Sequence, residues 1–217
     1  MDALEKLQKW LKGLSISIDE DRAQTLITFL QELLVWNKKI NLTAIKTLDE
    51  GIEKHLIDSL TVVRFLKGDE RLLDIGSGGG LPVIPLKIYF PELEAFSVDS
   101  VEKKILFQRH AIRKLRLHGV TAIHSRAEML AEEKSLRETF DIVISRAFSS
   151  LDMFVEMAYP FLKKGGRLIA MKGPDGVVEI RKNQKSLEKM GWTNCTMNEI
   201  CLPQSRAKRT LIVLTRN

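Results

Sequence analysis

Glycines that alternate after an apolar run are the residues of this chain best suited to chemistry. The segment 72–81 reads LLDIGSGGGL, so Gly76, Gly78 and Gly80 follow a run that ends at Ile75. Glycine adopts positive φ and lets backbone amides approach a ligand, and the helix expected next has unpaired N–H groups at its start. The segment therefore predicts a ligand-binding loop between a strand and a helix.

The spacing of these glycines distinguishes between cofactors. The dinucleotide fingerprint GxGxxG fails, because its third glycine falls on Leu81, or on Val83 when the count starts at Gly78. The pattern DxGxGxG fits from Asp74 to Gly80 and is the pattern of S-adenosylmethionine enzymes. Asp74 is expected to reach the ammonium group of that cofactor, directly or through water. The alternative is a glycine-rich turn that binds no ligand.

Two further turns carry side chains suited to the same cofactor. Asp99 ends the run FSVD and is suited to accept both ribose hydroxyls, although a helix N-cap also explains an acid there. The turn SRAE at 125–128 follows the third expected strand. In this fold the turn borders the adenine, so its backbone amides, as at Ala127, and Glu128 are candidate adenine contacts, with a helix cap as the alternative.

The segment 141–150, DIVISRAFSS, ends the fourth expected strand, where an acceptor meets the methyl group. It lacks the [DN]PP[YF] loop of amine methyltransferases, and neither Cys195 nor Cys201 lies near this edge to add to a pyrimidine ring. A ring nitrogen with a free lone pair, such as guanine N7, needs neither device. Arg146 is then expected to orient the cofactor carboxylate or guanine O6, and Phe148 to stack on a base. A surface arginine and a core phenylalanine are the alternatives, and no general base is assigned.

These loops require strands that end at one edge of a sheet. Up to about residue 66 the pattern is helical, and either Ser17, in a capping box with Glu20, or Asp19 begins the second helix. From residue 71 short apolar runs alternate with amphipathic helices, which implies a parallel sheet covered on both faces. Strands are expected at 71–75, 95–98, 120–124, 141–144 and 167–171. Helices are expected at 52–66, 81–89, 102–117, 127–138, 151–162 and 176–190.

The tail differs from this rhythm. The runs 194–201 and 209–214 are joined by LPQSRAK, which is too short for a crossover helix, so they are expected to form a hairpin with one antiparallel strand. Seven strands with one antiparallel strand near the end is the layout of class I, Rossmann-like methyltransferases. The expected organisation is an N-terminal helical extension at 1–66, packed on a class I core at 67–217.

Composition favours an anionic partner. The 217 residues carry a net charge of +6, which suits nucleic acid. Two cysteines without CxxC or zinc spacing predict no metal site, and the N-terminus and apolar runs predict no signal peptide or membrane span, hence a cytoplasmic protein. Basic residues expected on an RNA face, or else on a solvated surface, are Lys38, Lys39, Lys103, Lys104, Arg109, Arg113, Lys114, Arg116, Arg206, Lys208 and Arg209.

The motifs together resemble one family. They are Trp36-Asn37, NLT at 41–43, HxxDSL at 55–60, DIGSGGGLPVIPL, DSVEKK, SRAE, SRAFSSL and MKG at 171–173. This set is similar to the glucose-inhibited division protein B family, also called ribosomal RNA small subunit methyltransferase G. The resemblance implies a class I fold, S-adenosyl-L-methionine as cofactor, and methylation of guanine N7 in an exposed loop of 16S (small-subunit) ribosomal RNA, either naked or within a ribonucleoprotein particle. It places cofactor contacts at Gly76, Leu81, Ala127, Glu128 and Arg146.

The chain departs from the family pattern in two places. GLPG becomes GLPV through Val83, which is expected to narrow the mouth of the glycine loop, and the usual Arg-His becomes Arg209-Thr210. The residues alone leave two other functions open: a methyltransferase of the same fold that acts on a small molecule or protein, and a domain that holds the cofactor without catalysis. They also leave open whether the N-terminal motifs hold the extension on the core or contact substrate.

Overall fold

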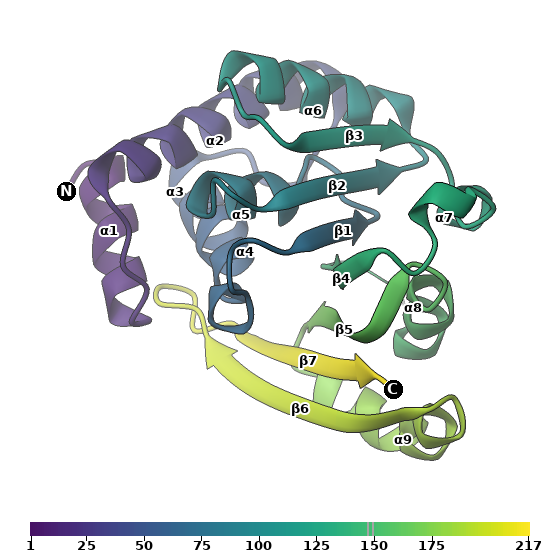
Figure 1. The fold of residues 1–217 in the computed structure, drawn as a ribbon. Coiled ribbons are helices and arrows are strands. Elements are labelled where there is room, and N and C mark those ends of the chain that lie inside the picture. The colour runs from purple at the N-terminus through teal and green to yellow at the C-terminus, as the bar shows by residue number, and fades with distance from the viewer. Residues whose placement is uncertain (147, 149) are drawn as a thin grey trace.

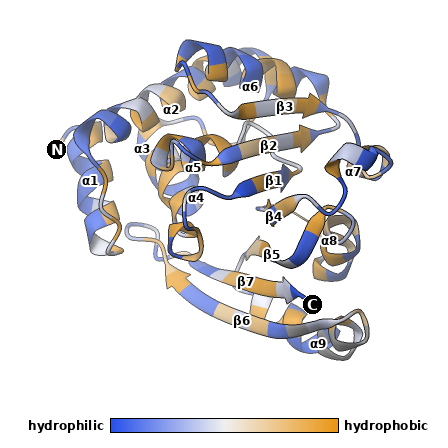
Figure 2. Ribbon diagram, viewed as in Figure 1, coloured by the Kyte–Doolittle hydropathy of each residue, from blue (hydrophilic) through white to orange (hydrophobic). Residues whose placement is uncertain are grey.

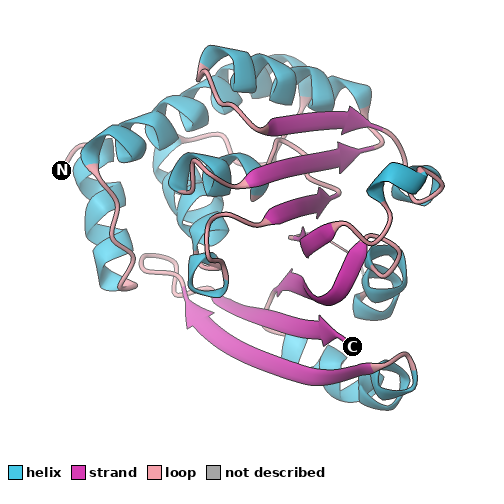
Figure 3. Cartoon of the chain, in the orientation of Figure 1, coloured by secondary structure: helices cyan, strands magenta, loops and turns pink. Residues whose placement is uncertain are grey.

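A seven-stranded sheet forms the centre of the molecule (Figures 1 and 3). The structure is a computed structural model that describes residues 1–146, 148 and 150–217. The strands are β1 (Arg71–Ile75), β2 (Glu94–Asp99), β3 (Val120–His124), β4 (Phe140–Ser145), β5 (Leu162–Lys172), β6 (Trp192–Cys201) and β7 (Lys208–Arg216). Their order is β3-β2-β1-β4-β5-β7-β6, and β7 pairs antiparallel with both β5 and β6. The predicted seven-stranded layout with a terminal hairpin is confirmed.

Helices cover both faces of this sheet (Figure 1). Before β1 come α1 (Ala3–Gly13), α2 (Glu20–Ile40), α3 (Leu48–Gly51), the π-helix η1 (Ile52–Ile57), α4 (Asp58–Leu60) and the 3₁₀-helix η2 (Val63–Phe65). After β1 come α5 (Val83–Tyr89), α6 (Glu102–Lys114), α7 (Ala127–Leu130), η3 (Lys134–Leu136), α8 (Leu151–Ala158) and α9 (Gly176–Lys189).

Alternate strand side chains divide the interior into two cores. Leu72 points into the first core, which contains buried residues of α1, α2, η1, α5 and α6, whereas its neighbour Leu73 points into the second, which α7, α8 and α9 complete. This is the period-2 alternation of a strand with both faces buried. Figure 2 shows the matching pattern, with hydrophobic residues along the strands and mixed polarity on the helices. The helices before β1 therefore share a core with the sheet.

Local capping decides where the long helix α2 begins. Asp19 is extended and its carboxylate accepts a hydrogen bond from the backbone N–H of Arg22 at 2.8 Å. Asp19, rather than Ser17, is therefore the N-cap. At the other end Asn41 adopts the left-handed conformation, with φ of 50°, and ends the helix.

Three expected helices differ from the structure for identifiable reasons. The segment expected as one helix at 52–66 opens with the π-helix η1 and ends in the 3₁₀-helix η2. The helix expected at 127–138 stops at Leu130, because the polar run 132–135 has no apolar side chain to bury. The helix expected at 151–162 stops at Ala158, since Pro160 has no N–H to continue it, and Leu162 begins β5.

The hairpin is docked against the π-helix. The Glu53 carboxylate, only 3% exposed, accepts hydrogen bonds from the backbone N–H groups of Gln204 and Ser205 at 2.5 and 2.8 Å. This contact holds the β6–β7 turn at the edge of the sheet where β4 and β5 end. Within the described residues, none of the helices combines the length and the apolar character that crossing a membrane requires.

Candidate active site

The glycine loop after β1 is open on one side and tightly packed on the other. Gly76 and Gly78 have φ of +74° and +57°, and among the described residues no atom lies within 4 Å of where their Cβ atoms would stand. Gly80, with φ of +78°, differs, because a Cβ there would collide with the side chain of Ile84. The first two glycines thus leave room for a ligand, and the third lets α5 pack closely.

A buried glutamine of α6 braces this loop. Gln108 Nε2 donates hydrogen bonds to Ser77 Oγ and to the Gly78 carbonyl, each at 2.8 Å. Sequence reasoning missed Gln108, although it lies three residues from both Ile105 and Ala111 on the apolar face of α6. A polar residue on such a face is the signal that was available.

The extension supports the same loop from beneath. A Cβ at Gly79 would lie 2.8 Å from Leu33 Cδ1 of α2, so the helix packs directly against the loop backbone. The position of the loop therefore depends on both the sheet and the helices before it.

Asp74, at the end of β1, is fully buried beneath the loop. Its Oδ2 accepts a hydrogen bond from the Val83 N–H at 3.3 Å, whereas Oδ1 has no partner among the residues that the structure describes. Burial raises the pKa of this carboxyl well above its usual value, with the hydrogen bond from Val83 and the Arg146 charge opposing that rise. A carboxylate oxygen left without a partner fits a cationic group of a ligand.

Asp99, at the end of β2, contacts the glycine loop and lines a cavity of about 420 Å³. Its Oδ2 accepts from the Gly78 N–H and its Oδ1 from the Val101 N–H, both at 2.9 Å. The carboxylate thus fixes the loop and the start of α6 rather than serving as the N-cap itself, which is Val101. The cavity is lined by Ile75, Gly76, Val98, Asp99, Ser100, Val101, Lys104, Ser125, Arg126, Ala127, Glu128 and Met157.

The lining includes four of the nine residues predicted for the cofactor, whereas Asp74, Gly78, Gly80, Leu81 and Arg146 do not line this cavity. Gly76, Asp99, Ala127 and Glu128 come from three different turns and face one cavity, with Ala127 buried at the start of α7 and Glu128 exposed. Leu81 is instead buried in the first core.

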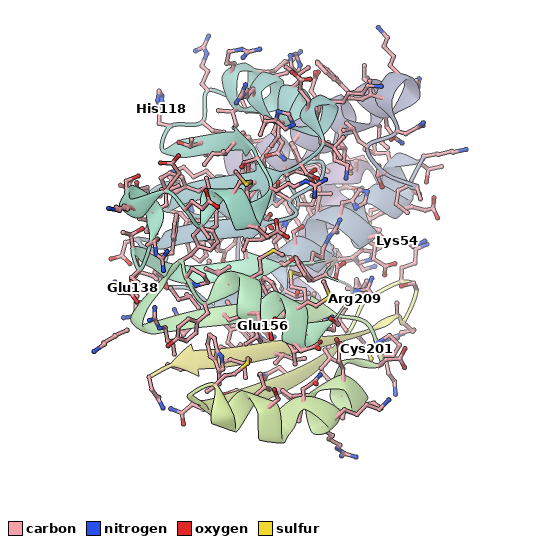
Figure 4. All side chains as sticks on the ribbon, turned by 90° about the vertical axis from the view of Figure 1, so that its right-hand side faces the viewer. Lys54, His118, Glu138, Glu156, Cys201 and Arg209 are labelled. Atoms are coloured by element: carbon pink, nitrogen blue, oxygen red, sulfur yellow. The ribbon has the colours of Figure 1, made fainter. Side chains whose placement is uncertain are left out.

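A second cavity, of about 270 Å³, lies where β4, β5 and β7 meet the π-helix. Its lining residues are Ile45, Lys54, His55, Asp58, Arg146, Met171, Lys172, Gly173 and Arg209. In Figure 4, Lys54 of the helical region and Arg209 of β7 lie on the same side of the molecule, away from Glu138.

Arg146 is held in this second cavity by the helical region. Its NH1 donates to the Lys54 carbonyl at 2.9 Å and lies 3.6 Å from Asp58 Oδ2, while Asp58 Oδ1 accepts from Arg209 Nε at 2.8 Å. Burial lowers the pKa of the Arg146 guanidinium, and the Asp58 and Asp74 carboxylates oppose that decrease. One buried carboxylate therefore holds two guanidinium groups at the cavity.

His55 connects the cavity to the NLT motif. Its Nε2 lies 2.8 Å from Thr43 Oγ1 and its Nδ1 lies 3.1 Å from the Lys54 carbonyl. Thr43 in turn is held by the Asn37 amide, which accepts from the Thr43 N–H at 2.8 Å. Burial, with the nearby Arg146 charge, lowers the pKa of His55 to about 4, so the ring is neutral at pH 7. These contacts lie within residues 1–66 and order the two motifs against each other, while Asp58 of the HxxDSL motif makes the link to the core through Arg146 and Arg209.

Two other residues occupy positions that differ from their expected roles. The Phe148 ring lies 5.2 Å from that of Phe154 and packs against the second core, as in the alternative to base stacking. Ala147 and Ser149 of the SRAFSSL motif lie outside the described residues. Val83 is fully buried in the first core and lines neither cavity, so the expectation that it narrows the loop mouth is wrong. Thr210 is also fully buried.

Most of the basic residues predicted for an RNA face are exposed. Those with exposed side chains are Lys38, Lys39, Lys103, Arg109, Arg113, Lys114, Arg116, Arg206 and Lys208, whereas Lys104 and Arg209 are half-buried. Several are also engaged within the fold: Arg109 donates to the Ala122 carbonyl, Lys114 pairs with Glu32, Lys104 lies 3.7 Å from Asp99, and Arg209 pairs with Asp58. The end of α2 packs beside α6, with Trp36 against Phe107 and His110.

Comparisons with known proteins agree with this geometry. Residues 22–208 match the family model GidB, described as rRNA small subunit methyltransferase G. The protein named ribosomal RNA small subunit methyltransferase G from Syntrophotalea carbinolica is 46% identical over 211 residues, 97% of each chain, and that from Geotalea uraniireducens is 49% identical over 189 residues, 87% of this chain and 85% of that one. The structure of M. jannaschii TYW2 in complex with AdoMet has a TM-score of 0.58 at 17% identity, covering 79% of this chain and 78% of that one, a likeness of fold alone. The chain therefore belongs to the GidB family, rRNA small subunit methyltransferase G.

Proposed function

We propose that this protein transfers a methyl group from S-adenosyl-L-methionine to N7 of a guanine in 16S ribosomal RNA in the cytoplasm. The observation that carries the proposal is the buried Asp74 Oδ1, which has no partner in the described part of the chain and lies beneath two glycines with open space above them. The family match adds the ribosomal RNA named in its relatives. In this proposal residues 67–217 form the methyltransferase core and 1–66 its helical extension.

The residues around the first cavity fit the cofactor. Asp74 would accept the ammonium group, directly or through water, and Asp99 would accept the ribose hydroxyls with the lone pairs that its two backbone contacts leave free. The backbone at Ala127 and the Glu128 side chain would border the adenine. When bound, S-adenosylmethionine supplies an electrophilic methyl group.

The acceptor needs no general base from the protein. With the donor bound, the N7 lone pair of guanine would form the new bond to the methyl carbon, and the electron pair of the former C–S bond would stay on sulfur. Because N7 carries no proton, none has to be removed, and the main task of the chain is to align the base with the methyl carbon. In this proposal the base would enter the second cavity, which Arg146, Met171 and Lys172 line at the ends of β4 and β5.

Exposed lysines and arginines beside the two cavities would contact RNA phosphates. Lys38, Lys39 and Lys103 extend from α2 and α6, and Arg206 and Lys208 from the hairpin docked on Glu53. Each phosphate neutralised releases counterions, so RNA affinity is expected to fall steeply as salt rises. A flat response between low and physiological salt would remove RNA from the proposal.

The test is methyl transfer to RNA that lacks the modification. The protein is incubated with radiolabelled S-adenosylmethionine and total RNA from a strain without the gene, and the labelled RNA is digested to nucleosides. The expected product is 7-methylguanosine, from the small-subunit RNA only. Label in 5-methylcytidine or N6-methyladenosine, or label confined to small molecules or protein, would contradict the proposal.

A further inference from the structure

The second cavity contains a charge arrangement that the methyl-transfer reaction does not by itself require. Asp58 is 4% exposed and holds Arg146 and Arg209 on its two oxygens. Burying a carboxylate between two arginines is costly unless every charge is matched. Here the two guanidinium groups exceed the carboxylate by one positive charge, at the wall of a cavity rather than in a sealed core.

Hydrogen-bond donors and acceptors at this wall remain available for a molecule in the cavity. A guanidinium carries five N–H groups and a carboxylate about four lone-pair sites. In the described structure, NH1 of Arg146 contacts Lys54 and Asp58, while Nε and NH1 of Arg209 contact Asp58 and the Lys208 carbonyl. The wall can therefore present guanidinium donors beside a carboxylate acceptor to a molecule in the cavity.

This order of donor and acceptor matches one purine edge. Guanine has the O6 acceptor next to the N1–H and N2–H donors, whereas adenine has the N6–H donor next to the N1 acceptor. Arginine beside aspartate therefore pairs with guanine and opposes adenine. Because the contacts lie on the Watson–Crick edge, N7 on the opposite side of O6 stays free to react.

We propose that Asp58 recognises the acceptor base by accepting the N1–H and N2–H groups of guanine, while a guanidinium that it holds donates to O6. This inference rests on the proposed function and names the residue that makes the same site specific for guanine. The contact also strengthens during the reaction. As the N7–C bond forms, positive charge spreads over the ring, N1–H becomes more acidic, and its hydrogen bond to a carboxylate shortens and tightens.

The π-helix explains why Asp58 is available for this role. It adds a wide turn at 52–57, and within seven residues the chain directs Glu53 to the hairpin, His55 to Thr43 and Asp58 to the two arginines. Such turns within helices are frequent at functional sites.

The experiment uses Asp58→Asn with two RNA substrates. The small-subunit RNA carries, at the modified position, either guanosine or 2,6-diaminopurine riboside, which has N7 but a donor at position 6 and an acceptor at N1. We expect Asp58→Asn to lower kcat on guanosine by about 100-fold, with cofactor affinity unchanged in calorimetry. We also expect the ratio of kcat/KM for guanosine to that for diaminopurine to fall by about tenfold or more, because the asparagine amide can donate to N1.

Glu53→Gln is the matched control. It removes a buried carboxylate from the π-helix just before Asp58, but one that binds the hairpin backbone and does not line the cavity. This variant should keep the wild-type base ratio. An unchanged ratio in Asp58→Asn would overturn the proposal, since a merely structural role lowers both activities together.

A second variant decides the outcome if Asp58→Asn fails to fold or to bind the cofactor. Arg209→Lys keeps the charge next to Asp58 but loses the Nε contact, and it should lower the base ratio about fivefold. A wild-type ratio in Arg209→Lys would then overturn the proposal. A wild-type enzyme that makes no 7-methylguanosine would contradict the proposed function itself, whereas guanosine methylation with a ratio insensitive to both substitutions would contradict only the role of Asp58.

Discussion

Substituting Asp74 by asparagine should change cofactor affinity and protein stability in opposite directions. The variant keeps one oxygen for the Val83 N–H and places an NH₂ group where Oδ1 now lies without a partner in the described structure. In the proposed function the ammonium group of the cofactor would contact this atom, directly or through water. A carboxylate acceptor is thus replaced by a donor that repels the cation.

The magnitudes follow from the burial of this side chain. A hydrogen bond to a charged group contributes about 1.5–3 kcal/mol, so S-adenosylmethionine should bind about 10- to 150-fold more weakly. Removing a fully buried, incompletely partnered charge should stabilise the free protein by about 1 kcal/mol, which raises the Tm of a chain of this size by about 2–4 °C.

The pH dependence provides an internal check. The pKa of Asp74 is higher in the folded protein than its ordinary value of 3.8. This carboxyl therefore destabilises the fold increasingly as pH rises from 3.8 through the higher folded pKa. The gain in Tm should therefore be large at neutral pH and shrink towards acidic pH. Calorimetric titration gives the affinity and a thermal melt without cofactor gives Tm. A variant that binds the cofactor normally, or that melts below wild type at neutral pH, would refute this reasoning.

Other substitutions test the elements that build the site. His55→Gln should make the free energy of unfolding less dependent on pH below 6.5. The pKa of His55 is about 4 in the folded protein against 6.5, so about 3 kcal/mol of stability present above pH 6.5 is lost as pH falls towards 4. Urea titrations at several pH values measure this, and an equal pH dependence of the unfolding free energy in both proteins would contradict it. Glu53→Ala leaves the N–H groups of Gln204 and Ser205 without their acceptor and should cost about 2–4 kcal/mol by urea midpoint at unchanged m-value, with Glu53→Gln costing less. Gly78→Ala should cost about 1–2 kcal/mol for its positive φ and weaken cofactor binding, whereas Gly80→Ala, which also collides with Ile84, should cost about 1–3 kcal/mol more; equal melting temperatures for the two would count against the described loop.

The sequence predicted the frame of the molecule because its signals are local. The alternation of apolar runs and amphipathic helices placed the first five strands, and two strand-like runs joined by the short link LPQSRAK predicted the terminal hairpin. The DxGxGxG spacing predicted the loop, and four of the residues expected at the cofactor line one cavity: Gly76, Asp99, Ala127 and Glu128.

The parts that sequence reasoning missed are contacts between distant segments. The position of Gln108 on the apolar face of α6 indicates burial, but its partners Ser77 and Gly78 lie about 30 positions away and follow only from the fold. Asp58 and Arg146 are 88 positions apart, and their pairing depends on how the π-helix lies against the end of β4. Helix ends were also misjudged where polar runs or Pro160 limit the buried stripe, since burial depends on the neighbouring layer.

A crystal structure of the protein with S-adenosylhomocysteine, the methyl-transfer product, tests the central claim most directly. The adenosine should occupy the cavity lined by Gly76, Asp99 and Glu128, with the amino group within hydrogen-bonding reach of Asp74 Oδ1, directly or through one water. Nucleoside bound elsewhere, or a carboxylate of Asp74 that remains without a ligand contact in the complex, would contradict the account.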